Sequence, residues 1–98
     1  MKLVRDHARE QHSEAHFERL SEEDFPRYLR LKLQEEVQEY LAQSSAEELA
    51  DILEVVYALA ELQGIQKDNL EALREVKARE QGTFRERLAL VRKEPTHG

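Results

Sequence analysis

The sequence contains no cysteine, no tryptophan, two prolines and three glycines among its 98 residues. The lack of cysteine excludes a disulfide-stabilised scaffold and a zinc finger with thiolate ligands. The scarcity of glycine and proline argues against an all-β fold, which needs many tight turns. Leucine, glutamate, alanine, arginine and glutamine are abundant instead, so we expect an all-α protein.

Basic residues are fewer than acidic ones. The chain has 15 lysines and arginines and 21 aspartates and glutamates, which gives a net charge of −6. A net negative chain binds polyanions poorly, so no nucleic-acid polymer is expected as a partner. The most apolar stretch, residues 49–62, is too short to span a bilayer and contains acidic residues. The first residues lack the apolar run of a signal peptide. We therefore expect a soluble, cytoplasmic protein with no membrane contact.

The length predicts a single helical domain over residues 1–98. A domain of this size buries only about two thirds of the surface that its unfolded chain exposes. Since no disulfide can compensate for so small a core, a second subunit is expected to extend it.

Apolar residues recur every three to four positions in three stretches, which is typical of amphipathic helices. The helices are expected at residues 25–43, 45–63 and 68–81. Residues 1–23 are expected to be irregular and residues 92–98 to form a frayed tail. The apolar residues of 83–91 fit either a short strand or a half-helix. The expected architecture is a helical hairpin plus a third helix.

The sequence predicts Ser44 as the N-cap of the second expected helix, with Ser45 as the alternative. Ser44 and Glu47 match the capping box, in which a serine and a glutamate three residues later satisfy each other's backbone amides. Ser45 and Glu48 match it as well, and that pairing would give Glu48 a purely structural role.

The second expected helix is apolar over more than half of its circumference. Leu49 and Leu53 lie on one side, and Ile52 and Val55 lie on the adjoining side. A surface helix in a small monomer does not need so wide an apolar arc. We therefore expect the bundle to be completed by homodimerisation, or by a dimer of dimers; coverage by the third helix alone is the alternative.

Four carboxylates fall on helix faces that should be buried. Glu36 and Glu39 lie along the first helix, and Glu48 and Asp51 along the second, each pair three residues apart and so on one face. In an antiparallel hairpin Glu39 is at the height of Glu48, and Glu36 at the height of Asp51. The register therefore predicts that four acidic groups converge between two helices.

Such a cluster is costly by itself, because two like charges about 4 Å apart repel by about 4 kcal/mol at an effective dielectric constant of about 20. A divalent cation relieves the repulsion, and an all-carboxylate site suits Mg²⁺ or Mn²⁺. Lys32 lies between Glu36 and Glu39 on the helix surface and is a candidate for holding an anionic substrate. Glu35 lies on the solvent side, where it is placed to activate a water. The alternative is that these glutamates are simply solvated.

The same residues match a known sequence signature. Glu35-Glu36-Val37-Gln38-Glu39 followed by Glu48-Leu49-Ala50-Asp51 resembles the EExxE…ExxD signature of the MazG-like, all-α nucleoside triphosphate pyrophosphohydrolases. Lys2-Leu3-Val4-Arg5-Asp6 is similar to the N-terminal KLVRD of small members. Residues 51–59 resemble their second helix, and Lys77 with Gly82 and Phe84 resembles their K…RGxF segment.

The resemblance implies a helical unit completed by dimerisation and Mg²⁺-dependent cleavage of a nucleoside triphosphate between its α and β phosphates. It implies that the metal ligands are Glu36, Glu39, Glu48 and Asp51, and that Glu35 activates water. The candidate phosphate contacts are Arg5, Lys32, Lys77 and Arg85. The chain departs from the family pattern at Gln81, where an arginine is frequent, and in the short spacing between Glu39 and Glu48. These departures bear on substrate identity more than on the metal ligands.

Two alternatives to a general nucleotide house-cleaning enzyme remain open. One is a phosphoribosyl-ATP pyrophosphohydrolase of histidine biosynthesis, which belongs to the same superfamily. The other is a non-catalytic helical interaction module, which would need the wide apolar arc but not the four matched carboxylates.

Overall fold

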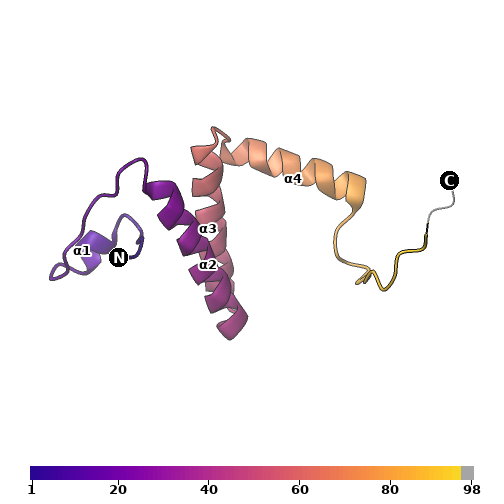
Figure 1. Ribbon diagram of the computed structural model, residues 1–98, viewed down its shortest axis with the longest axis horizontal. Coiled ribbons are helices and arrows are strands. Elements are labelled where there is room, and N and C mark those ends of the chain that lie inside the picture. The colour runs from indigo at the N-terminus through magenta and orange to yellow at the C-terminus, as the bar shows by residue number, and fades with distance from the viewer. Residues whose placement is uncertain (96–98) are drawn as a thin grey trace. The chain divides into compact units, whose positions relative to one another are not determined.

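The computed structural model describes residues 1–95, in which all regular structure is helical (Figure 1). The helices are α1 (Ala8–Gln11), α2 (Phe25–Gln43), α3 (Ala46–Leu62) and α4 (Lys67–Gln81). No strand occurs among the described residues, so the expected all-α class is confirmed. The last three residues of the expected tail at 92–98 lie outside the described part of the chain.

The chain divides into two compact units, residues 1–67 and the residues from 68 onward. The first unit contains the packed pair α2 and α3. The second contains nearly all of α4, which has no buried residue and ends before Gly82, whose positive φ of 85° suits glycine. The prediction of a single domain remains a prediction.

Helix α2 begins and ends as the sequence predicts, at Phe25 and Gln43. Asp24 is its N-cap residue, but its side chain makes no capping bond; the Asp24 amide instead donates to Ser21 Oγ at 3.1 Å. Pro26 falls in the first turn, where its missing N–H costs nothing. The turn before α2 is therefore stabilised by Ser21.

The N-cap of α3 is Ser45, so the expectation that Ser44 fills this role is wrong. The Ser45 hydroxyl accepts from the Glu48 amide at 3.3 Å. Ser44 ends α2 instead, in the left-handed conformation with a φ of 54°, and its amide donates to the Tyr40 carbonyl. Because only two residues separate the helices, one serine must end the first helix and the other must start the second.

Helix α3 ends in a Schellman motif. Gly64 has a φ of 77°, its amide donates to the Glu61 carbonyl, and the Ile65 amide donates to the Ala60 carbonyl. Gly64 thus fills the C-terminal position that the sequence predicts for it.

Helices α2 and α3 pack against each other and run in opposite directions (Figure 1). Their shared core is small: Leu29 is 3% exposed, and Val55 and Ala60 are the other buried hydrophobic residues. Leu41, Leu49 and Leu53 are exposed. The helix pair therefore has a thin core and an uncovered apolar surface.

Two segments differ from the expectation. Residues 83–91 form neither a strand nor a half-helix, but an irregular stretch with a turn at Arg85 and Glu86. The short helix α1 interrupts the irregular N-terminal segment, and no apolar period in the sequence indicates it. Among residues 1–95, no helix is long and apolar enough to cross a membrane.

Replacing Leu29 by alanine is expected to lower the free energy of unfolding by about 2–4 kcal/mol, because it empties the most buried position of the core. Leu31→Ala is the matched control, since Leu31 is half exposed on the same helix, and it should cost about 0.5 kcal/mol or less. Urea unfolding followed by circular dichroism measures both. Equal effects in the two variants would contradict the described core.

Candidate functional site

The packed pair α2 and α3 buries acidic side chains as well as hydrophobic ones. Glu36 is 5% exposed and Glu48 is 9% exposed, whereas Glu39 and Asp51 are partly exposed. Glu36 shares the α2 face of buried Leu29, and Glu48 shares the α3 face of buried Val55, seven residues away in each case and so two helical turns. The helix pair therefore buries two of the four predicted carboxylates at its own interface.

Glu36 is only half neutralised. Its Oε1 lies 3.2 Å from Lys32 Nζ, but its Oε2 is buried and has no hydrogen-bond partner. A buried carboxylate oxygen without a partner is costly, because it loses water and gains nothing in exchange. Lys32 also lies 3.5 Å from Glu35, so its single charge is shared between two acids. The site consequently has more negative charge than its own cation neutralises.

The electrostatics reflect this excess of negative charge. The charge of Glu36 is the main cause that raises the pKa of Glu39, with smaller contributions from burial and from Glu35 and Glu48. Burial works to lower the pKa of Lys32, but the hydrogen bond to Glu36 and the charges of Glu35 and Glu36 outweigh it, so this pKa is raised. Glu36, Glu39 and Glu48 thus lie within electrostatic reach of one another, with Lys32 firmly protonated beside them.

Asp51 makes a different contact. Arg5 donates to Asp51 Oδ1 at 2.6 Å, and Lys2 donates to Glu35 Oε1 at 3.3 Å. The N-terminal segment therefore brings two cations to the carboxylates. The sequence singles out Arg5 as a candidate phosphate contact but does not indicate Lys2, because no local pattern reveals a pairing across more than thirty residues.

A cavity of about 620 Å³ adjoins these groups. Its lining includes Arg5, Lys32, Glu36 and Asp51, together with apolar side chains of α2, α3 and the N-terminal segment. This volume is within the range of small-molecule sites, and a mixed apolar and charged lining is typical of them.

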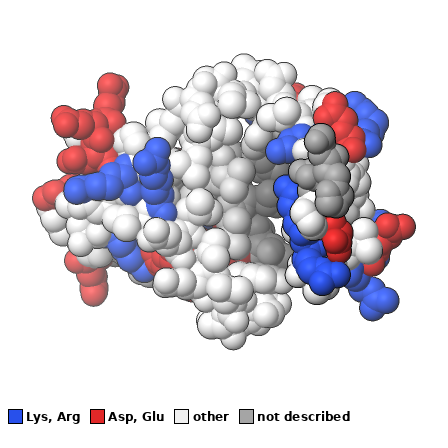
Figure 2. Space-filling view, turned by 45° about the vertical axis from the view of Figure 1, so that its right-hand side comes forward, with Lys and Arg blue, Asp and Glu red and all other residues white. Residues whose placement is uncertain are grey.

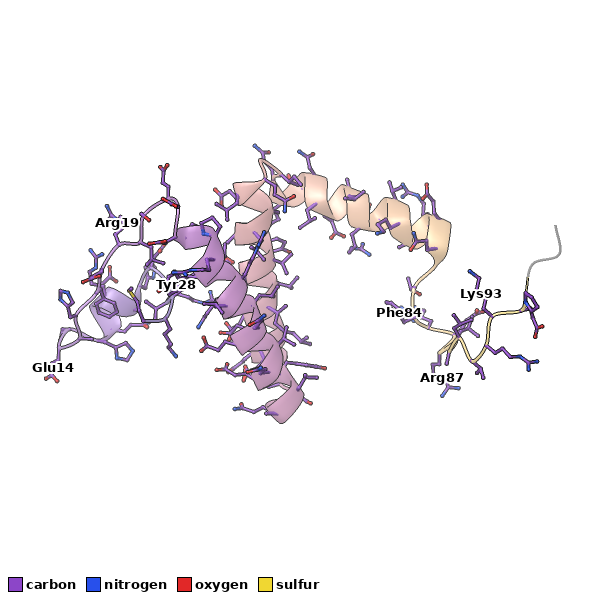
Figure 3. All side chains as sticks on the ribbon, in the orientation of Figure 1. Glu14, Arg19, Tyr28, Phe84, Arg87 and Lys93 are labelled. Atoms are coloured by element: carbon purple, nitrogen blue, oxygen red, sulfur yellow. The ribbon has the colours of Figure 1, made fainter. Side chains whose placement is uncertain are left out.

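The other two candidate phosphate contacts belong to the second unit. Lys77 on α4 and Arg85 in the following segment are both exposed. Phe84 and Arg87 project from that segment (Figure 3), along which blue basic side chains gather in Figure 2.

The donor chemistry fits a hard divalent cation, because every candidate ligand is a carboxylate oxygen and Glu36 Oε2 lacks a partner. As the side chains lie, no three acidic or histidine groups of residues 1–95 are grouped closely enough to hold a metal ion. Asp51 is turned to Arg5, and Glu36 to Lys32. Binding would therefore require these carboxylates to leave their present partners, which the rotatable bonds of Asp and Glu side chains permit.

No protein-family model matches the chain, and searches of curated proteins and of solved structures found no match either.

Glu36→Gln is expected to lower the pKa of Glu39 toward its ordinary value, because it removes the charge that disfavours the ionised form of Glu39. A raised pKa favours the folded state at low pH, and this contribution disappears as the pH rises through that pKa. In the Glu36→Gln variant, the contribution of Glu39 to the pH dependence of folding stability should therefore be smaller. Carbon-detected NMR titration of glutamate carboxyls measures the shift.

Glu71 provides the internal control for that titration. The Arg74 guanidinium donates to it and lowers its pKa, so it should titrate identically in both proteins. An unchanged Glu39 pKa in the variant would mean that the two carboxylates do not interact.

Proposed function

We propose that the protein is a Mg²⁺-dependent nucleoside triphosphate pyrophosphohydrolase that acts in cytoplasmic nucleotide house-cleaning, with Mn²⁺ as an alternative cation. The observation that carries the proposal is the buried, half-neutralised carboxylate of Glu36 beside Glu39 and Glu48. An unpaired buried carboxylate oxygen is uncommon, since buried polar groups are almost always hydrogen-bonded, and a bound cation would pair it.

Glu36, Glu39, Glu48 and Asp51 are the proposed metal ligands. The bound cation would neutralise triphosphate oxygens and the charge that develops on the leaving pyrophosphate. The reaction adds water to the α phosphorus and breaks the bond between that phosphorus and the bridging oxygen. It yields a nucleoside monophosphate and pyrophosphate.

The chain's own residues supply the remaining functions. Glu35 is the proposed group that orients the attacking water and takes its proton, since it is partly exposed at the edge of the site. Its negative charge is moderated by Lys32 and Lys2, at 3.5 and 3.3 Å. Lys32 and Arg5 line the cavity and are placed to attract an anionic substrate. The apolar lining would receive the nucleoside.

We further propose that the active form is a homodimer. Val37 and Leu41 on α2 and Leu49 and Leu53 on α3 are exposed hydrophobic residues around the link between the helices. A second copy would cover this surface and enlarge the thin core. The same surface would serve a non-catalytic interaction module, so only the carboxylates distinguish the two functions.

Glu36→Gln and Asp51→Asn are each expected to reduce pyrophosphate release from nucleoside triphosphates at least about 100-fold, because each removes a charged ligand of the cation that stabilises the transition state. Release of pyrophosphate from a panel of ribo-, deoxyribo- and oxidised triphosphates, with Mg²⁺, measures the activity and the base preference. Phosphoribosyl-ATP belongs in the panel.

Glu47→Gln is the matched control, since Glu47 is an exposed glutamate adjacent to Glu48. It should retain wild-type activity, and circular dichroism should show helical content in all three variants. Full turnover by Asp51→Asn in excess Mg²⁺ would contradict the ligand assignment. Absence of turnover by the wild type on every substrate would favour the interaction module.

Leu53→Glu is expected to convert the dimer into monomers, because it places a charge in the proposed interface. Leu31→Glu is the control, since Leu31 is equally exposed but lies off the apolar stripe of α2. Sedimentation equilibrium measures the mass of each. A monomeric wild type would contradict the dimer.

A further inference from the structure

The N-terminal strap, residues 2–7, is tied to the helix pair by its two cations. Lys2 donates to Glu35 and Arg5 donates to Asp51, at 3.3 and 2.6 Å. Within residues 1–95, no other side-chain hydrogen bond joins the strap to the helices. Both therefore end on carboxylates to which the proposed function gives a chemical role.

The strap also forms one wall of the cavity. Leu3, Val4 and Arg5 line it from one side, and Lys32, Glu36 and Asp51 line it from the helices. Leu3 is partly buried, whereas Val4 and Arg5 are exposed. Ion pairs therefore hold the strap over the cavity, and burial of apolar side chains contributes little.

An ion pair of this kind is easily exchanged. The Arg5 side chain is 61% exposed and the Asp51 side chain 37% exposed, and exposed ion pairs contribute little net stability. Arg5 contacts Oδ1 of Asp51, and a divalent cation that bound the same carboxylate would place like charge beside the guanidinium. Arg5 and a divalent cation therefore compete for one group.

We infer that the strap is a latch that divalent-cation binding releases: the cation takes Asp51 from Arg5, and the strap loosens over the cavity. The inference rests on the proposed metal site. Release would free the Arg5 guanidinium at the cavity wall, where a triphosphate is the complementary anion. In the metal-free protein, Arg5 would thus be bound to Asp51 and would not be available to phosphate. The affinity for substrate would therefore depend on the metal, because the metal would release Arg5.

Competition of this kind is reciprocal. If the cation loosens the strap, then removing the latch must tighten cation binding by the same factor. Arg5→Gln is therefore expected to bind Mg²⁺ and Mn²⁺ about twofold to fivefold more tightly than the wild type, the range that corresponds to an exposed ion pair. Calorimetric titration with each metal alone, without nucleotide, measures the affinity. Arg5→Lys keeps the charge and should remain close to the wild type.

Arg9→Gln is the matched control, because it removes a charge from the same part of the chain at an exposed residue of α1. A general electrostatic effect would tighten metal binding in both variants equally, and this result would overturn the inference. NMR relaxation supplies an independent readout. Addition of Mg²⁺ at constant ionic strength should increase backbone mobility in residues 2–7 of the wild type.

The outcomes separate the latch from the proposed function. Equal metal affinity in the wild type and Arg5→Gln, with no change in strap mobility, overturns the latch and leaves the metal site standing. Failure of both proteins to bind either metal overturns the metal site, and the latch with it. Two results together support both the latch and the metal site. Arg5→Gln, but not Arg9→Gln, must bind the metal more tightly than the wild type, and the metal must loosen the strap of the wild type.

Discussion

The structure depends on one incompletely compensated interaction, the ion pair between Lys32 and Glu36 in the interface of α2 and α3. Lys32 neutralises one carboxylate oxygen and leaves the other buried without a partner. In a helix pair whose core contains so few buried hydrophobic residues, this is a large electrostatic cost to retain. A hydrophobic residue at position 36 would make a better core, so the carboxylate is more readily explained by chemistry than by stability.

The thin core and the acidic interface are two aspects of one arrangement. Each position that α2 and α3 use for Glu36 or Glu48 is a position that a leucine could fill. Leu49 and Leu53, on the same helix as Glu48, are exposed. An acidic site within a two-helix unit thus creates a need for additional apolar contacts elsewhere. The proposed second copy of the chain would supply them, because it brings the same exposed surface.

Local periodicity and helix-capping residues predict the limits of the helices and the face that is buried. The limits of α2 follow from Pro26 in the first turn and from the end of its apolar stripe, and the Schellman end of α3 follows from Gly64. The burial of Glu36 follows from its place on the α2 face of Leu29. The prediction of Ser44 as the N-cap of α3 is wrong, because both serines match the capping pattern and only the backbone of the turn decides between them. Pairings between distant segments leave no periodic trace, so the contact of Arg5 with Asp51 was unforeseen.

That contact changes the meaning of the four-carboxylate pattern. Helix geometry predicts that Asp51 completes the acidic group, whereas in the structure its charge is neutralised by Arg5 and it contributes no resolved repulsion to Glu39. The repulsion is thereby confined to Glu36, Glu39, Glu48 and Glu35, and the strap lowers the electrostatic cost of keeping the carboxylates together. A cation that bound there would have to stabilise the carboxylates more than Lys2 and Arg5 already do. If the proposed cation binds there, it would have to be an ion of high charge density, because a monovalent ion would gain little over an arginine that is already in place.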